Sequence, residues 1–154
     1  MPHGSVKAII PASRPEVFQL LHDYSRRLEW DTLLQAAYLT DGWTTAQLHA
    51  TSICQGRSRL FSIALKTEYV TFHPPNVAAV RLVNRPPFFE TFAATIRHRD
   101  LTETSSEIEY IYHFTARPRV LRWVLHPIMS WMFRRETEKR LKALAEFLAK
   151  SASG

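Results

Sequence analysis

The sequence predicts an α+β fold in a single domain spanning residues 1–154. Between residues 33 and 117, strand-like segments follow one another with turn residues between them and no helical period. After Pro118 the apolar residues recur with a helical period that continues to about Lys150. Of the 154 residues, 45% are hydrophobic and 22% are charged, which are ordinary values for one globular domain. These values exclude a disordered chain, a collagen-like repeat and a disulfide-rich scaffold.

The N-terminal segment predicts a strand followed by two short helices. Residues 5–10 alternate loosely between polar and apolar side chains, as a half-buried strand does, and a proline follows them. Ser13 is suited to cap a helix, because Glu16 follows it by three residues as in a capping box. Residues 26–30 predict a second short helix. It ends near Asp31, which we interpret as a capping or turn residue rather than a catalytic carboxylate.

The central part of the chain predicts six more strands. They are expected at residues 34–38, 48–54, 60–72, 77–84, 88–101 and 107–116. Turn residues such as Asp41-Gly42 separate neighbouring strands, and a polar loop at residues 102–106 joins the last two. Because no helix intervenes among these six strands, consecutive strands are expected to pair as an antiparallel meander. With the first strand, the sheet is expected to have about seven strands.

Four motifs of the sequence resemble one known superfamily. They are the run Ile10-Pro11-Ala12-Ser13-Arg14-Pro15-Glu16-Val17-Phe18, the pair Asp23-Tyr24, the triplet Glu29-Trp30-Asp31 and the amphipathic segment 138–148. In this order they are similar to the helix-grip, or SRPBCC, superfamily, which includes START-type lipid-transfer proteins and polyketide cyclase/dehydrase-like proteins. The resemblance implies a curved antiparallel sheet wrapped around a long C-terminal helix, with an apolar cavity between them. It implies little about function, because one fold hosts many activities.

The alternation of side chains along the strands identifies candidate cavity residues. Successive strand residues face opposite sides of a sheet, so each predicted strand has an inward-facing set. We predict that seven inward-facing residues contact a ligand: Tyr38, Ser52, Leu65, Leu82, Phe92, Tyr110 and Tyr112. The alternative is that these residues only fill a core.

The C-terminal helix supports a cavity independently. At about 100° per residue, one helix face carries Trp123, Ser130, Thr137, Leu141, Leu144 and Leu148. The leucines suit ordinary packing, whereas Ser130 and Thr137 are short and polar where a filled interface needs larger apolar residues. They leave room and offer hydroxyl groups, so we predict that both bind the ligand. A shallow packing defect is the alternative.

The sequence contains no motif for phosphate, metal or nucleophilic chemistry. Gly42 and Gly56 lie in separate turns, which excludes a glycine-rich phosphate loop. Cys54 lies within a predicted strand and no Gly-x-Ser-x-Gly motif occurs, so an activated nucleophile is not expected. The seven histidines form no cluster with the spacing of zinc ligands. We therefore predict no metal, no cofactor and no assigned catalytic residue.

These observations predict a protein that binds a small hydrophobic or amphiphilic molecule, of lipid or polyketide type, between the sheet and the C-terminal helix. The alternative is an enzyme resembling the polyketide cyclases, in which Tyr110, Tyr112 or His126 would protonate or orient the ligand. An enzyme needs a titratable group shifted by burial in the pocket, whereas a carrier needs only apolar walls. No acid–base pair is visible in the sequence, so binding is favoured.

Positive charge is concentrated in the last quarter of the chain. Residues 117–154 carry nine basic and three acidic side chains, which accounts for the whole net charge of +6. This asymmetry favours an anionic partner. The basic residues of the helix alternate with acids and have no interleaved aromatic residues, so no nucleic-acid partner is predicted.

The first half of the C-terminal helix is apolar on all sides. Leu121, Leu125, Ile128 and Met132 lie opposite the predicted packing face, with arginines beside them. A neighbouring loop of the same domain can cover this stripe. Otherwise the stripe is a docking surface for a second subunit or for an anionic membrane.

The sequence also predicts a cytoplasmic location. Its single cysteine, Cys54, cannot form a disulfide within the chain, and residues 1–5 lack the basic start of a signal peptide. The longest apolar stretch, residues 120–133, is interrupted by charge and proline and is shorter than the roughly 20 residues needed to span a bilayer.

Overall fold

The computed structural model describes residues 3–57 and 63–153. Its elements, in chain order, are β1 (His3–Ile10), α1 (Arg14–Leu21), α2 (Arg27–Trp30), β2 (Leu34–Thr40), β3 (Thr51–Gly56), β4 (Ala64–His73), β5 (Val77–Leu82), β6 (Phe89–Asp100), β7 (Ser106–Ala116), a 3-10 turn (Arg119–Leu121) and α3 (Arg122–Ser153). Seven strands form one sheet with the order β1-β7-β6-β5-β4-β3-β2. Every neighbouring pair is antiparallel, and β2 to β7 pair in chain order, so the predicted meander and the α+β class are confirmed. The first strand, β1, pairs with β7 at the end of the meander.

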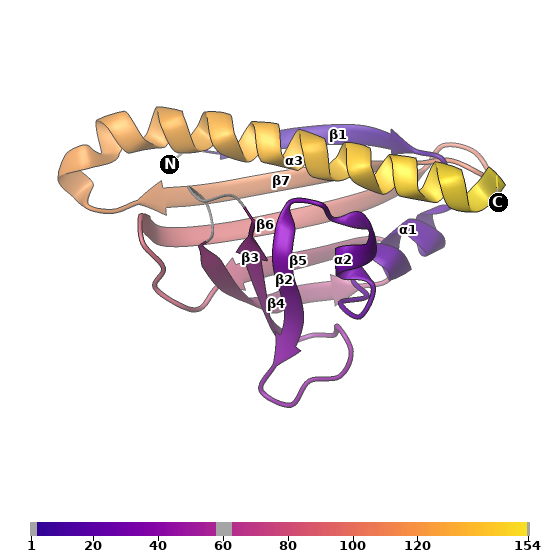
Figure 1. Cartoon of the computed structure of the whole chain (residues 1–154), viewed down its shortest axis with the longest axis horizontal. Helices are drawn as coiled ribbons and strands as arrows, with labels where there is room; N and C mark the ends of the chain where they lie inside the picture. Colours follow the sequence, from indigo (N-terminus) through magenta and orange to yellow (C-terminus); the bar gives the residue numbers. More distant parts are fainter. Residues whose placement is uncertain (1–2, 58–62, 154) are drawn as a thin grey trace.

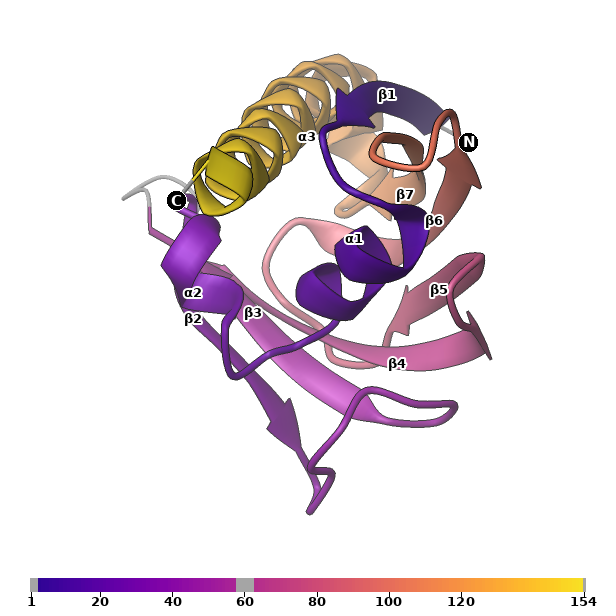
Figure 2. The same cartoon turned by 90° about the vertical axis from the view of Figure 1, so that its right-hand side faces the viewer.

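The sheet curls around the helices. In Figure 1, α3 runs along the whole length of the sheet. Figure 2 looks along α3 and shows the strands curving from β1 round to β2, with α1 and α2 inside the curve. The helix packs against β1 and β7, and α2 closes the space between α3 and β2. This is the curved sheet wrapped around a long C-terminal helix that the resemblance implied.

Ser13 occupies the predicted cap position of α1, but its side chain makes no hydrogen bond to the helix backbone. Ser13 is the N-cap residue, and its hydroxyl donates a hydrogen bond to Glu16 Oε1 at 3.0 Å. The helix then buries Val17, Phe18, Leu20 and Leu21 against the concave face of the sheet. Because most of this short helix faces the core, packing rather than intrinsic propensity holds it in place.

Two strands begin more than two residues after their predicted start. The strand predicted from residue 48 begins at Thr51, because His49 adopts a positive φ of 72° and the Ala50 N–H closes a turn onto the Gln47 carbonyl at 3.0 Å. The strand predicted at residues 60–72 is described from Ala64 to His73 as β4. Its predicted beginning, residues 60–62, lies outside the described residues.

Two of the three core clusters among the described residues lie under α3, and the third joins Phe18 of α1 to Tyr69 and Ala78 of the sheet. The second half of the helix buries Leu141, Leu144 and Leu148, as the helical period predicted, among residues of β1, α1 and β7. The first half covers an aromatic group that includes Phe92, Tyr112 and Phe114. The cavity described next lies between these regions and the far strands of the sheet.

Candidate ligand-binding cavity

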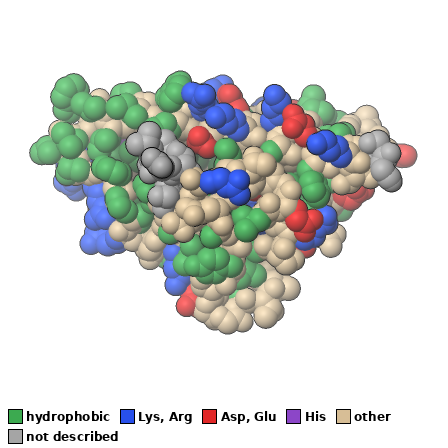
Figure 3. Space-filling view, in the orientation of Figure 1, with side chains coloured by type: hydrophobic (Ala, Val, Ile, Leu, Met, Phe, Trp, Pro, Cys, Tyr) green, Lys and Arg blue, Asp and Glu red, His purple; other side chains and the backbone are tan. Residues whose placement is uncertain are grey.

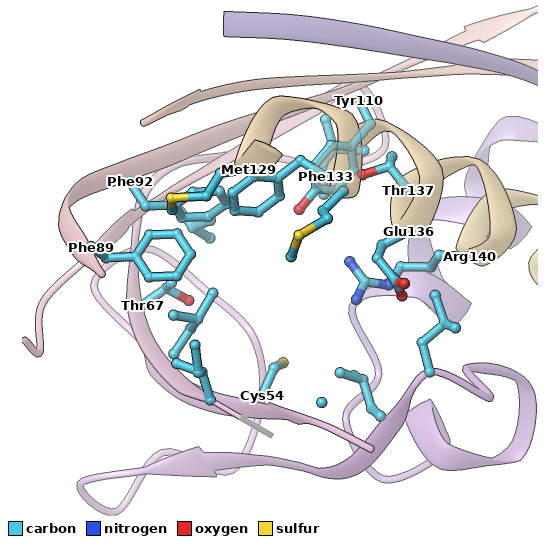
Figure 4. Close-up of a pocket in the computed structure, with 18 of the residues that line it drawn as sticks. Cys54, Thr67, Phe89, Phe92, Tyr110, Met129, Phe133, Glu136, Thr137 and Arg140 are labelled. Carbon is cyan, nitrogen blue, oxygen red and sulfur yellow. The ribbon is translucent and has the colours of Figure 1, made fainter. Parts of the chain in front are cut away.

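A cavity of about 390 Å³ lies between the concave face of the sheet and α3. This volume is within the usual range for small-molecule sites, about 300–1,000 Å³. The lining combines sheet residues from β2 to β7 with residues of α3 from Leu125 to Arg140. Figure 4 shows Phe89, Phe92, Met129 and Phe133 gathered at one end, with Glu136 and Arg140 at the other. The cavity therefore has an aromatic end and a charged end.

Four of the nine predicted ligand-contacting residues line this cavity. They are Leu65, Phe92, Tyr110 and Thr137. Their role as ligand contacts stays a prediction, but their placement follows the alternation of the strands and the period of the helix. Thr137 is buried, as expected of a short residue on the packing face of α3.

Three more predicted residues face inward without lining the cavity. Ser52 is fully buried, and its hydroxyl donates to the Tyr24 hydroxyl oxygen at 3.0 Å. Tyr112 is buried under α3, with its ring stacked on Phe133 at 5.4 Å between centroids. Leu82 packs against the aromatic group under the first half of α3. These residues support the wall of the cavity from behind.

The prediction for Tyr38 is wrong, since its side chain is 49% exposed and lies away from the cavity. The register of β2 shifts between Leu34 and Ala36, which marks a β-bulge. One extra residue reverses the side-chain alternation beyond it, so every later residue of β2 faces the opposite side. Leu34, which precedes the bulge, therefore lines the cavity, whereas Tyr38 does not.

The prediction for Ser130 is also wrong. Ser130 is half-buried but does not line the cavity, and Trp123 from the same predicted face is 79% exposed. The predicted face was extended backward from Thr137 in steps of seven, which drift by about 20° each on a straight helix. Met129 and Phe133, spaced by four residues from Thr137, occupy the inward positions instead.

The cavity-facing stripe of α3 was not predicted from the sequence. Leu125, Met132, Glu136 and Arg140 all line the cavity, although Leu125 and Met132 were placed on the opposite face. Their spacing of three and four residues, with Met129 between them, is itself a helical stripe. Starting from the buried Leu141 and Leu144 and stepping back by three and four residues would have found it.

A buried ion-pair cluster forms the charged end of the cavity. Arg27 Nε donates to Asp31 Oδ2 at 2.9 Å, and Arg140 Nε lies 3.0 Å from the same oxygen. The Asp31 side chain is fully buried, and its Oδ1 accepts the Leu33 N–H at 3.2 Å, which is the predicted turn role. Burial alone would raise the pKa of Asp31, but Arg140 and Arg27 hold it below its ordinary value.

The Arg140 guanidinium lines the cavity, as do Arg27 and Arg57. It shares the Asp31 carboxylate with Arg27, and its Nε lies 3.0 Å from Oδ2 without the alignment of a hydrogen bond. Figure 4 shows its guanidinium and the Glu136 carboxylate directed into the cavity. A ligand oxygen within reach of this guanidinium would accept a hydrogen bond from a charged donor and would be stabilised.

A chain of neutral polar groups continues behind the charged end. His22 Nδ1 and the Tyr69 hydroxyl are 2.7 Å apart, and the Tyr24 and Tyr69 hydroxyls are 3.2 Å apart. Burial, reinforced by His98 and Arg27, holds the pKa of His22 well below its ordinary value. Burial raises the pKa of Tyr24, Tyr69 and Cys54. His22, Tyr24 and Tyr69 are therefore neutral at pH 7, and together they are a set of hydrogen-bonding groups rather than charges.

The groups proposed for cyclase-type acid–base chemistry are not brought together. Of Tyr110, Tyr112 and His126, only Tyr110 lines the cavity. His126 Nε2 accepts the Ala116 N–H at 3.1 Å, which fixes its ring at the start of α3.

The described residues contain no group of histidine, cysteine and carboxylate side chains that can hold a metal ion. None of the helices described here is long and apolar enough to cross a membrane.

A curved antiparallel sheet gripping a C-terminal helix, with a cavity between them, defines a helix-grip protein of the START/SRPBCC superfamily. The chain belongs to the polyketide cyclase/dehydrase and lipid transport family, whose model matches residues 1–148. Among curated proteins, none matches the sequence.

Solved structures with this fold include enzymes and proteins without an activity in their description. The Zhui aromatase/cyclase from Streptomyces superposes with a TM-score of 0.80 at 12% identity, covering 98% of this chain and 95% of its own. A START superfamily protein from Mycobacterium smegmatis gives 0.75 at 11% identity, covering 95% and 98%. A protein from Thermus thermophilus gives 0.81 at 12% identity, covering 97% and 99%. At these identities the likeness shows the fold alone.

Proposed function

We propose that this protein binds a small amphiphilic molecule in the cavity, with an apolar body against Phe89, Phe92 and Phe133 and an acidic or carbonyl oxygen at Arg140. The observation that carries the proposal is that the Arg140 guanidinium is directed into a cavity whose walls are mostly apolar. The family description also supports it, because polyketides and lipids are both largely apolar molecules with oxygen functions.

The difference in polarity between the two ends of the cavity favours one orientation of the ligand. Aromatic rings at one end offer a large apolar surface, which favours an aromatic or acyl body by about 25 cal/mol for each Å² removed from water. At the other end, a hydrogen bond to a charged donor contributes about 1.5–3 kcal/mol. Glu136 lies on the same side of α3 one turn earlier and disfavours a negatively charged ligand there. Arg140 and Glu136 therefore act on an anionic ligand with opposite signs.

A cyclase-like activity is the second candidate. The observation that favours it is that the Tyr110 phenol, the Glu136 carboxylate and the Arg140 guanidinium face one cavity. In such an enzyme Arg140 would stabilise negative charge on a carbonyl oxygen, and Glu136 or Tyr110 would move a proton. A carrier releases the ligand unchanged, whereas an enzyme releases a different compound.

Two fluorescent probes with nearly the same aromatic body test the charged end. 1-Anilinonaphthalene-8-sulfonate carries an anionic group, and N-phenyl-1-naphthylamine lacks it. Arg140→Gln should weaken binding of the sulfonate about tenfold and leave the neutral probe within about twofold, because only the former uses the guanidinium. Glu136→Gln should strengthen binding of the sulfonate, because it removes a repelling carboxylate. Fluorescence titration of each variant measures the dissociation constants of both probes.

Lys142→Gln is the matched control, since Lys142 is an exposed basic residue of the same helix outside the cavity. This substitution should leave the dissociation constants of both probes unchanged. Equal weakening of both probes by Arg140→Gln, with unchanged urea denaturation, would show that the guanidinium does not orient the ligand. The cytoplasmic location expected from the sequence is part of this proposal and stays a prediction.

A further inference from the structure

The first half of α3 presents an exposed apolar surface beside the cavity. Val120 and Trp123 are 78% and 79% exposed, and Trp131 and Ile128 are 60% and 50% exposed. We call Val120, Leu121, Trp123, Ile128 and Trp131 the helix-start patch. Figure 3 shows hydrophobic side chains gathered over the beginning of α3, with basic side chains beside them. Exposed tryptophans are costly in water, so a contiguous patch of this kind marks an interaction site.

The helix-start patch borders the mouth of the cavity. Ile128 belongs to the patch and also lines the cavity, and Leu125 and Met132 continue inward from it along α3. Phe88, across the mouth before β6, lines the cavity and is 51% exposed. A partner on the patch would therefore lie over the opening through which a ligand passes.

The charges around the helix-start patch have one sign. Residues 117–135 contain five arginines and no acidic residue. Arg117 donates to the carbonyls of Arg85 and Pro86, and Arg122 donates to the Ala116 carbonyl, so these bonds go to neutral groups and not to a carboxylate. Arg135 lies over the Trp131 ring at 5.2 Å, whereas Arg134 pairs with Glu138 at 3.2 Å. In the described chain, Arg119, Arg122 and Arg135 pair with no carboxylate.

We propose that the helix-start patch docks on an anionic membrane surface and sets the cavity mouth against the lipid headgroups. Tryptophans insert at the boundary between headgroups and acyl chains, and arginines beside them bind anionic lipids. Each basic side chain near an anionic leaflet contributes about 1 kcal/mol. A second copy of the chain fits less well, because a twofold interface would place this arginine cluster against itself.

Vesicle cosedimentation tests the docking. The wild-type chain should bind mixed vesicles of phosphatidylcholine and phosphatidylglycerol. Its binding to vesicles of phosphatidylcholine alone should be at least tenfold weaker. Trp123→Ser combined with Trp131→Ser should weaken binding to the mixed vesicles at least tenfold. Ile9→Ser combined with Val70→Ser is the matched control, because both residues are exposed and lie on strands. It should bind as the wild type does.

A charge variant keeps the test decisive if the tryptophan variant does not fold. Arg119→Gln combined with Arg135→Gln should lose most of the binding to mixed vesicles, while Lys139→Gln combined with Lys142→Gln should not. Equal binding of the wild type to both vesicle types would overturn the proposal. So would a dimer that sedimentation velocity detects in the wild type but not in the tryptophan variant. The folded variants should still bind N-phenyl-1-naphthylamine, so a failure of docking is distinguishable from a failure of the cavity.

Discussion

Asp31→Ala should lower the free energy of unfolding by about 3–5 kcal/mol, which is the usual cost of removing one partner from a buried charge cluster. The change leaves Arg27 with its guanidinium buried and without its carboxylate. It also leaves Arg140 without its ion pair. The lost contribution is large because the Asp31 side chain is fully shielded from water.

Urea denaturation measures this loss, and Glu138→Ala provides the comparison. Glu138 pairs with Arg134 at an exposed position, so its removal should cost under about 1 kcal/mol. The pKa of Asp31 in the folded protein lies below its ordinary value of 3.8. Its contribution to the free energy of unfolding is therefore fully present above pH 3.8. The contribution is lost as the pH falls from there through the folded-state pKa. A loss near that of Glu138→Ala would show that the cluster does not hold α2 and α3 together.

Cys54→Trp should abolish the binding of both aromatic probes. Cys54 lies on β3 and faces the cavity opposite α3, as Figure 4 shows. An indole at this position would occupy the space that a ligand body needs. Larger side chains in a filled core lower the free energy of unfolding by about 1–3 kcal/mol. The cavity has room for the indole, so Cys54→Trp should destabilise the fold by less.

Cys54→Ser is the control, since it keeps the size of the side chain and should leave both binding constants within about twofold. Circular dichroism and urea denaturation establish that each variant folds. Undiminished probe binding by a folded Cys54→Trp variant would place the binding site elsewhere on the protein.

The fold was predictable from the sequence because its signals are local. Alternation along the strands, turn residues between them and the change to a helical period after Pro118 each depend on neighbouring residues. The same local patterns placed Leu65, Phe92, Tyr110 and Thr137 correctly around the cavity. They also predicted the buried leucines in the second half of α3.

The remaining features of the site depend on distant parts of the chain. No local sequence pattern predicts the bulge between Leu34 and Ala36. The extra residue in this bulge turns the Tyr38 side chain to the opposite face of the sheet. The charged end joins Asp31, at the end of α2, to Arg140, far along α3, and only the folded chain brings them within 3.0 Å. Helix periodicity identifies a face but not the element that the face meets, so Leu125 and Met132 were assigned to the wrong side.

The most direct test of the cavity as a binding site is the protection of Cys54, the single cysteine of the chain, from alkylation. N-ethylmaleimide should modify the half-buried thiol slowly, because burial raises its pKa and only the thiolate reacts. Saturating N-phenyl-1-naphthylamine should slow this modification at least tenfold, and the protection should vanish in denaturant. A rate that stays the same at saturating probe would contradict the account, since the bound molecule would then lie outside the space between the sheet and α3.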